Sequence, residues 1–372
     1  MGYNSSMTAV DAPDEGSVPA EESRAPSGLG GRVEVRMRRL DGFQQRHRPL
    51  AVLVGVAKKF GDDQAGNLAA LVAYYAFFSL FPLLLLLTTA VGFVLADDEA
   101  AQQSVVDSVL DKFPGLSDQL GDNIGAFQGS GTAIVVGALF ALWGGLGALG
   151  SMQNAMNTIW AVRFDERPPF LVERARSLIM LIVLGSGAIV TTVVTNVAGS
   201  LEGLPLLARG LVAAATLILN TGLFLLSFKV LTRQGLDWRR LVPGAVVAGV
   251  AFLILQSVGG WYVTRTLSRA TPLYGTFAVV LGLLTWLYLQ AQITMLAAEL
   301  NVVLARRLYP RSIISTDLAD LTSADERAFE SYAAIQQRHP HQHVAVTFVE
   351  PVEGDDRDPV ADTDHDRAAP PV

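Results

Sequence analysis

The chain has 372 residues, of which 51% are hydrophobic and only 17% are charged, and its formal net charge is −7. A soluble domain carries about 25% charged residues, so this composition excludes an ordinary soluble protein and indicates a polytopic membrane protein. The sequence contains no cysteine, which excludes a disulfide framework, a cysteine-ligated zinc site and an iron–sulfur cluster.

The first 48 residues are expected to form a disordered, basic cytoplasmic arm. Residues 1–31 are rich in small residues and acids, offer little to bury, and lack the pattern of a cleavable signal peptide. From residue 32 to residue 59, the charged residues are mostly basic. Residues 50–60 form an apolar stretch that is too short to span a membrane, so we expect an interfacial helix there. The basic residues of this region are Arg32, Arg36, Arg38, Arg39, Arg46, Arg48, Lys58 and Lys59.

Residues 49–307 are expected to form a six-span membrane domain. Uncharged apolar runs predict transmembrane helices at about residues 68–96, 133–160, 178–198, 207–231, 243–262 and 273–305. Pro82 should kink the first of them. Residues 97–132 carry seven acids and one base, and their apolar spacing predicts short amphipathic helices that lie over the bundle.

Two features of these spans predict how the helices meet. Gly137, Ala141 and Gly145 recur at four-residue spacing in the second span, which allows another helix to approach closely. The sequence Pro243-Gly244-Ala245 is expected to form the turn that begins the fifth span.

The sixth span is the most informative stretch of the sequence. It follows Thr271-Pro272, a cap residue and a proline suited to the first helical position, and it has no charged residue until Glu299. Four polar residues recur in it every seven positions and should form one polar stripe: Thr285, Gln292, Glu299 and Arg306. Because polar groups are costly in lipid, this stripe should face protein or water, so the sequence predicts an all-α helix bundle around it.

The distribution of basic residues predicts the orientation of the spans. Arginine and lysine gather in the N-terminal arm, in residues 163–176 and 229–240, and at the start of the C-terminal tail. The positive-inside rule then places both termini in the cytoplasm. Residues 308–372 are expected to be a cytoplasmic polar tail that is mostly disordered. One short helix is predicted in it, from a capping box at 323–326 to about Arg338.

No pattern of catalytic residues is found. The five histidines lie in the basic arm or in the tail, and no Walker sequence is present, so we expect neither an enzyme nor a bound metal or cofactor. The basic arm is expected to attract the anionic headgroups of membrane lipids. Nucleic-acid binding is not expected, because only Phe43 and Phe60 interleave the basic residues.

Glu299 is the only acid that the spans carry near membrane depth, and two interpretations remain open. In the structural one, it pairs with Arg306 or with an arginine of a neighbouring loop and orients the helix end. In the functional one, it belongs to an internal polar path with Gln292, Thr285, Asn154 and Asn157. Tyr74 is a further candidate, although a tyrosine at such a position more often packs or lies at the membrane interface.

Several short sequences occur in the order found in a known family. They are Ala73-Tyr-Tyr75 with Ser79-Leu-Phe-Pro82, residues 154–160, Pro243-Gly-Ala245, Tyr274-Gly275, Trp286-Leu-Tyr288 and Ala298-Glu-Leu-Asn301. Over about residues 50–307 the chain resembles the YihY/BrkB family of bacterial inner-membrane proteins, once described as ribonuclease BN. The resemblance implies a multi-pass protein of envelope integrity, with lipid or solute export proposed for some members.

The resulting hypothesis is an inner-membrane protein of envelope maintenance that binds or transports a lipid or another amphiphile. The alternative is a non-transporting scaffold whose arm and tails recruit partners. Ribonuclease activity is not expected, because the chain has no His/Asp cluster in a folded soluble domain. A cavity lined by Glu299, Gln292 and Asn154 would favour transport, and solid packing at that level would favour a scaffold.

Overall fold

The computed structural model describes residues 29–94, 131–199, 206–232, 236–267, 272–314 and 320–348. The regular secondary structure of these residues is entirely helical, which confirms the predicted all-α class for this part of the chain. The helices are α1 (Leu29–Arg46), α2 (Arg48–Asp62), α3 (Ala65–Val94), α6 (Gly131–Ile159), α7 (Phe170–Gly199), α8 (Leu206–Leu231), α9 (Trp238–Leu267), α10 (Pro272–Arg306) and α11 (Ser323–Ile335), with a 3-10 turn at Phe164–Glu166.

Each of the six predicted spans corresponds to one of the long helices, α3 and α6 to α10. Within the described residues, four stretches are long and apolar enough to cross a membrane: Phe170–Thr191, Gly210–Leu231, Trp238–Gly259 and Val280–Arg306. Helix α3 adds a shorter apolar stretch, Ala65–Leu80. The amphipathic helices expected in residues 97–132 fall almost wholly within residues 95–130, which lie outside the described residues.

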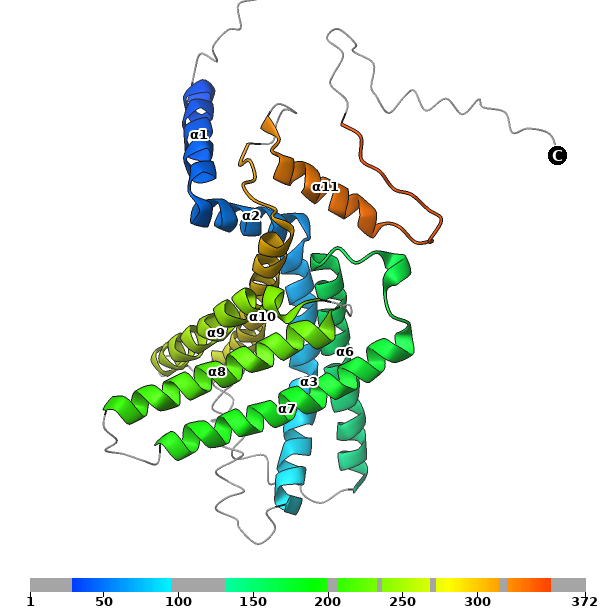
Figure 1. Ribbon diagram of the computed structural model, residues 1–372. Helices are drawn as coiled ribbons and strands as arrows, with labels where there is room; N and C mark the ends of the chain where they lie inside the picture. The colour runs from blue at the N-terminus through cyan, green and yellow to red at the C-terminus, as the bar shows by residue number, and fades with distance from the viewer. Residues whose placement is uncertain are drawn as a thin grey trace, which may run out of the picture.

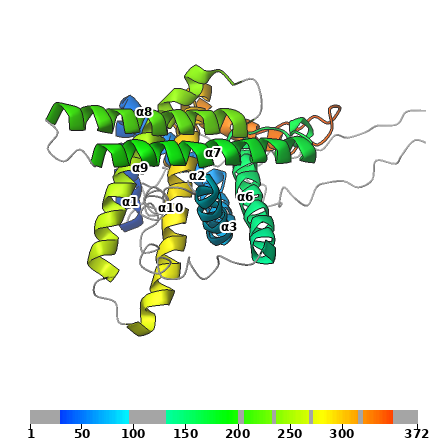
Figure 2. The same cartoon turned by 90° about the horizontal axis from the view of Figure 1, so that it is seen from below.

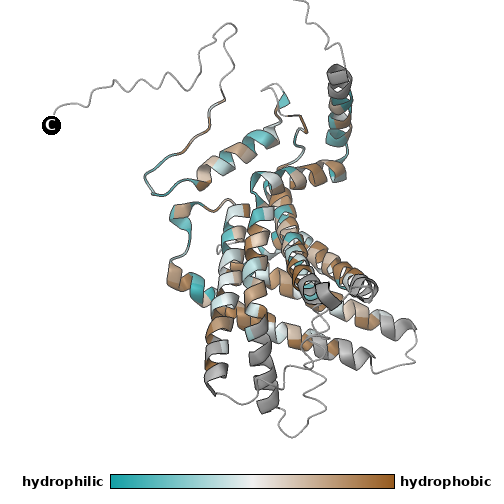
Figure 3. Ribbon diagram, turned by 180° about the vertical axis from the view of Figure 1, so that it is seen from behind, coloured by the Kyte–Doolittle hydropathy of each residue, from teal (hydrophilic) through white to brown (hydrophobic). Residues whose placement is uncertain are grey.

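The long helices pack as crossed pairs. Helices α3 and α6 lie side by side, as do α7 and α8, and α9 and α10 (Figures 1 and 2). The axes of α7 and α8 cross those of α3 and α6 steeply in Figure 1, while α10 also packs on α3 and α8 on α9. Hydrophobic residues predominate along the long helices, and hydrophilic ones are frequent in α1 and α11 (Figure 3).

Small residues set the contact between α3 and α6. A Cβ atom added to Gly144 would lie 2.7 Å from the Cβ atom of Ser79 and 2.9 Å from its Cα atom, so the two backbones touch. Gly145, predicted at a helix contact, lies against α7, where an added Cβ would meet the Leu181 side chain at 3.3 Å. The glycine-rich pattern therefore serves two contacts on neighbouring faces of α6.

The predicted turn at residues 243–245 is wrong. Helix α9 begins at Trp238 and runs through Pro243 without a break. Pro243 has no N–H to donate within the helix, and the next N–H points to another helix: the Gly244 N–H donates to Asn301 Oδ1 of α10 at 2.7 Å. Gly244 has no side chain, and its backbone comes so close to the Ala297 carbonyl that a Cβ atom would clash with it.

The N-terminal arm and the C-terminal tail were both expected to be disordered, but each has an ordered part where the two segments contact each other. Helix α1 covers part of the predicted arm, and residues 308–314 and 320–348 of the predicted tail are described next to it, including α11. The capping box of α11 uses Thr322 and Asp325, one residue earlier than predicted, and the helix ends at Ile335. Composition could not reveal this order, because it depends on contacts between α1, α2 and the tail.

Candidate functional site

Helix α2 carries two pairs of opposite charges, each four residues apart, near its C-terminal end. Lys59 and Asp63 face α6 and α10, whereas Lys58 and Asp62 face the segment that follows α10. Neighbouring residues on a helix are about 100° apart, so one short helix can present two such pairs to two different surroundings. Helix α2 thereby joins the long helices to the C-terminal segment.

The first pair belongs to what we call the buried charge cluster, made of Lys59, Asp63 and Glu299. The Lys59 ammonium donates to Asp63, and its Nζ lies 3.1 Å from Glu299 Oε2. The three side chains are 1%, 2% and 0% exposed. Burial raises the pKa of the Asp63 carboxyl, although the Lys59 charge acts in the opposite direction. The cluster is therefore a set of ionisable groups removed from water at the junction of α2 and α10.

The C-terminal end of α6 completes the surroundings of the cluster. The Lys59 ammonium donates to the Ile159 carbonyl at 2.8 Å, and the Arg306 guanidinium donates to the Trp160 carbonyl. Helix α6 ends at Ile159. Two residues later, Ala161 has φ of 48°, and the Val162 N–H donates to the Asn157 carbonyl as in a Schellman motif. Two cations thus bind the last free carbonyls of α6, where the helix dipole is negative.

The charges of the cluster do not balance. One ammonium faces two carboxyl groups, and neither oxygen of Glu299 accepts a hydrogen bond from a described residue. Arg306, the next cation, binds a backbone carbonyl and forms no ion pair within the part of the chain that is described. An uncompensated buried carboxylate is costly, so this excess of acidic groups carries an energetic cost if both are ionised.

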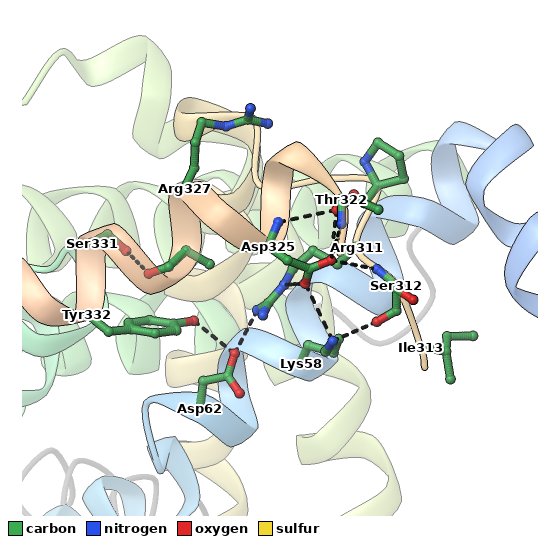
Figure 4. Close-up of polar contacts among 12 residues, drawn as sticks. Lys58, Asp62, Arg311, Ser312, Ile313, Thr322, Asp325, Arg327, Ser331 and Tyr332 are labelled. Atoms are coloured by element: carbon green, nitrogen blue, oxygen red, sulfur yellow. Dashed lines mark hydrogen bonds and ion pairs between the residues drawn. The ribbon is translucent and has the colours of Figure 1, made fainter. Parts of the chain in front are cut away.

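The second pair belongs to a network that fixes the C-terminal segment to α2 (Figure 4). Buried Arg311 donates to Asp325 Oδ1 and to Asp62 Oδ2, each at 2.7 Å. Asp325 also accepts the Ser312 N–H at 3.0 Å, and Lys58 donates to the Ser312 carbonyl at 2.6 Å. Burial opposes the charge of Asp325, but these bonds and those from Thr322 lower its pKa to about 2.

Helix α1 is tied to the same segment. Asp41 Oδ1 accepts the Ile313 N–H at 2.8 Å, and Gln44 Nε2 donates to the Arg311 carbonyl at 2.8 Å. On the far side, the Tyr332 hydroxyl donates to Asp62 at 3.0 Å. Burial and the Asp62 charge raise the pKa of Tyr332. These contacts hold α1, α2 and α11 together beside the ends of α3, α6 and α10.

A separate cavity of about 200 Å³ lies between α7, α8 and α9. Its lining is mostly apolar and includes Leu184, Ala188, Thr191, Asn220, Leu223, Phe224, Ser227 and Phe252. The hydroxyl of Ser227 bonds to a carbonyl of its own helix, that of Leu223, at 2.7 Å. Asn220 is 7% exposed, and its side chain is part of the lining. The cavity therefore combines mostly apolar walls with a side-chain amide.

Glu299 lies in the interior, but its partner differs from the predicted one. Arg306 follows seven residues later, about 10 Å along the helix, and reaches the Trp160 carbonyl instead of the carboxylate. The actual partner is Lys59, which the sequence had placed among the lipid-attracting residues of the arm. Lys59 is 1% exposed, so it cannot serve that purpose. In the sequence, the signal for this burial was the pair Lys59 and Asp63, spaced four residues apart at the end of an amphipathic helix.

The structure does not gather the predicted polar path around Glu299. Asn154 is exposed and accepts a hydrogen bond from Arg167 at 2.8 Å. Asn157 is buried, and its Oδ1 has no partner among the described residues. Thr285 is exposed and bonds to the carbonyl of Leu281 at 2.8 Å, and Gln292 is half-buried.

Tyr74, the remaining candidate, is 49% exposed. Its ring packs against Tyr75 and Phe78, with centroids 5.5 Å and 4.8 Å away. These contacts are those of an aromatic packing residue on the outer side of α3.

Comparison with known proteins places this arrangement in a family. The chain is 28% identical over 276 residues to the inner membrane protein YhjD of Escherichia coli, covering 68% of this chain and 81% of that protein. It is 26% identical over 264 residues to a UPF0761 membrane protein of Azotobacter vinelandii, covering 67% and 62% of the two chains. No solved structure matches the chain. The sequence profile named virulence factor BrkB matches residues 56–318, from the middle of α2 to beyond the end of α10. This multi-pass membrane protein therefore belongs to the virulence factor BrkB family.

Proposed function

We propose that the protein binds an amphiphile, such as a lipid, within the inner membrane and moves it as part of envelope maintenance, without enzymatic chemistry. The cavity between α7, α8 and α9 is the observation that carries this proposal. Its apolar lining suits a hydrocarbon chain, and Asn220 supplies a hydrogen-bonding group beside it.

The side-chain amide of Asn220 is the group that would select among ligands. An intramolecular hydrogen bond contributes about 0.5–1.5 kcal/mol, so a ligand with a hydroxyl, ester or amide group would bind beside this amide more tightly than a plain hydrocarbon. Ligand pockets for whole small molecules measure about 300–1,000 Å³. A cavity of about 200 Å³ therefore suits part of a larger amphiphile whose remainder stays in the bilayer.

The proposed topology has six spans and cytoplasmic termini. The positive-inside rule supports it, because basic residues gather before α3, between α6 and α7, between α8 and α9, and after α10. Some basic residues of the arm are exposed on α1 and remain available for anionic headgroups, namely Arg36, Arg39 and Arg46.

A second candidate function is a membrane scaffold. The burial of Glu299 favours it, because this carboxyl is enclosed by α2, α6 and α10 instead of lining a path with Asn154. The ordered assembly of α1, α2 and α11 would then present a fixed surface to partners.

A lipid flux assay separates the two candidates. The purified protein is reconstituted into vesicles that contain a fluorescent phospholipid, and movement of the probe between leaflets is followed by quenching from outside. We expect flux above that of protein-free vesicles, and a loss of most of it in Asn220→Leu. The matched control is Thr285→Val, which removes a hydroxyl that is exposed and bonded to its own helix.

Thermal stability in detergent distinguishes a binding defect from misfolding. Replacing the Asn220 amide by an apolar side chain of similar size in a mostly apolar cavity should change the stability little. Wild-type protein without flux above protein-free vesicles would support the scaffold. Full flux in Asn220→Leu would remove the cavity from the mechanism.

A further inference from the structure

We propose that the buried charge cluster of Lys59, Asp63 and Glu299 is a proton-binding site, which holds one proton between its two carboxyl groups while α2 is docked on α6 and α10. This inference concerns the cluster itself and does not depend on which molecule the protein binds or moves.

The composition of the cluster is the first argument. If both carboxyl groups were ionised, the cluster would carry one positive and two negative charges in a place where the side chains are at most 2% exposed. One bound proton removes the excess charge. Two carboxyl groups in one buried site commonly share a proton for this reason, because the second ionisation meets both desolvation and like-charge repulsion.

The hydrogen bonds are the second argument. The Lys59 ammonium has three N–H groups, and its partners are the Asp63 carboxylate, the Glu299 carboxyl and the Ile159 carbonyl. No donor remains on Lys59 for the other carboxyl oxygens. Apart from the ion-pair contact with Lys59 Nζ at 3.1 Å, neither oxygen of Glu299 has a donor among the described residues, so a proton on this group would supply a donor toward Asp63.

Among the described residues, the charged groups around the cluster form no ion pair with its two carboxyl groups. From α2, Asp62 adds a further negative charge next to the cluster. From α10, Arg306 donates its hydrogen bond to the Trp160 carbonyl, and its positive charge also acts on Asp63 without forming an ion pair in the described part of the chain. From α11, the Tyr332 ring lies 5.8 Å from Lys59 Nζ, and its hydroxyl donates to Asp62. From α6, the described contact with the cluster is the bond from Lys59 to the Ile159 carbonyl.

Because of where the cluster lies, the shared proton should affect the docking of α2. Asp63 lies at the junction of α2 and α3, and Glu299 lies near the end of α10, so the shared proton joins segments far apart in the sequence. Loss of the proton would leave an uncompensated negative charge between α2, α6 and α10 and would favour the entry of water. The docking of α2 should therefore weaken as the proton leaves.

The sign of the pH dependence follows from linkage. Burial raises the pKa of Asp63 above its ordinary value of 3.8, so the folded cluster binds more protons than the unfolded chain above that pH. Stability then falls as pH rises through the folded range of the cluster. Fully ionised groups stabilised by ion pairing would show the opposite trend, with stability lost toward low pH.

The test compares the wild type with Glu299→Gln, which resembles the protonated carboxyl, in detergent at about pH 5.5 and about pH 8.5. We expect the wild type to melt at a lower temperature at the higher pH. Glu299→Gln should melt close to the wild type at the lower pH and above it at the higher pH. Glu330→Gln is the control, because it neutralises an exposed carboxylate on α11. A variant that melts below the wild type at both pH values would overturn the proposal.

Infrared spectroscopy gives a second readout that does not require a stable variant. The wild type should show the carbonyl stretch of a protonated carboxylic acid at about pH 5.5, and it should lose this band when the pH rises to about 8.5. The band should be absent from Glu299→Gln, and Asp63→Asn should shift its pH midpoint. If the wild type lacks such a band at the lower pH, the cluster holds no proton and the inference fails, whether or not the variants fold.

Discussion

Replacing Asp325 by asparagine should release the C-terminal segment from α2 without unfolding the long helices. The Asp325 carboxylate accepts bonds from Arg311 Nε at 2.7 Å, the Ser312 N–H at 3.0 Å and the Thr322 hydroxyl at 2.8 Å. Its side chain is 0% exposed. Asparagine keeps the size of the side chain but removes its charge, so Arg311 is left with Asp62 as its remaining ion-pair partner.

The magnitude follows from the pKa of Asp325. A fall from 3.8 to about 2 corresponds to about 2.5 kcal/mol of stabilisation of the charged form, or roughly a 60-fold change in the docking equilibrium. Removing one partner of a buried ion pair costs about 3–5 kcal/mol, which sets an upper bound. Because the pKa is lowered, this stabilisation is complete above the unfolded value of 3.8 and is lost as pH falls toward 2.

Cysteine labelling measures the effect directly, because the chain has no cysteine of its own. A single cysteine at Ala328, which is 0% exposed on α11, reacts with a maleimide only when the segment opens. We expect Asp325→Asn to raise the labelling rate by about 30- to 100-fold, following the free energy above. The matched control is Glu326→Gln, which removes an exposed charge from the same helix turn and should change the rate little.

Two outcomes would refute the reasoning. A labelling rate that rises less than about threefold would mean that the carboxylate contributes little to docking, contrary to its lowered pKa. An equal increase in Glu326→Gln would show that general helix charge, and not the bonds to Arg311 and Ser312, controls the segment. The ratio of the two rates should stay constant between about pH 6 and about pH 8, far above the titration of Asp325.

Two further predictions concern packing and topology. Gly144→Ala should lower the melting temperature in detergent, because its Cβ would lie 2.9 Å from the Ser79 Cα atom and overpacking costs about 1–3 kcal/mol. Gly150→Ala on the same helix has open space and should not; equal melting of the two variants would contradict the α3–α6 contact. Single cysteines at Asp118 and Ser331 should label from opposite sides of the membrane, Asp118 from outside. Labelling of both from one side of intact cells would exclude the six-span topology.

Much of the membrane domain could be predicted from the sequence, because length and hydropathy are local properties of a helix. Helix α10 begins at Pro272 and ends at Arg306, as the proline, the uncharged run and the terminal arginines indicate. The C-terminal ends of α6 and α8 also agree with the prediction to within one residue. The turn at Pro243 failed because the acceptor for the Gly244 N–H lies on another helix, at Asn301.

The sequence by itself determined that the chain is a helical membrane protein, where its long helices lie, and that Glu299 is an exceptional carboxyl among them. Only the tertiary structure decided what surrounds that carboxyl. Hydropathy and spacing describe one helix at a time, whereas the pairing of Glu299 with Lys59 depends on which helix ends meet in space. For the same reason, the sequence shows how many basic residues the arm has but not which contact each of them makes. Lys59 turns inward to α6 and α10, Lys58 bonds to the C-terminal segment, and Arg39 remains exposed.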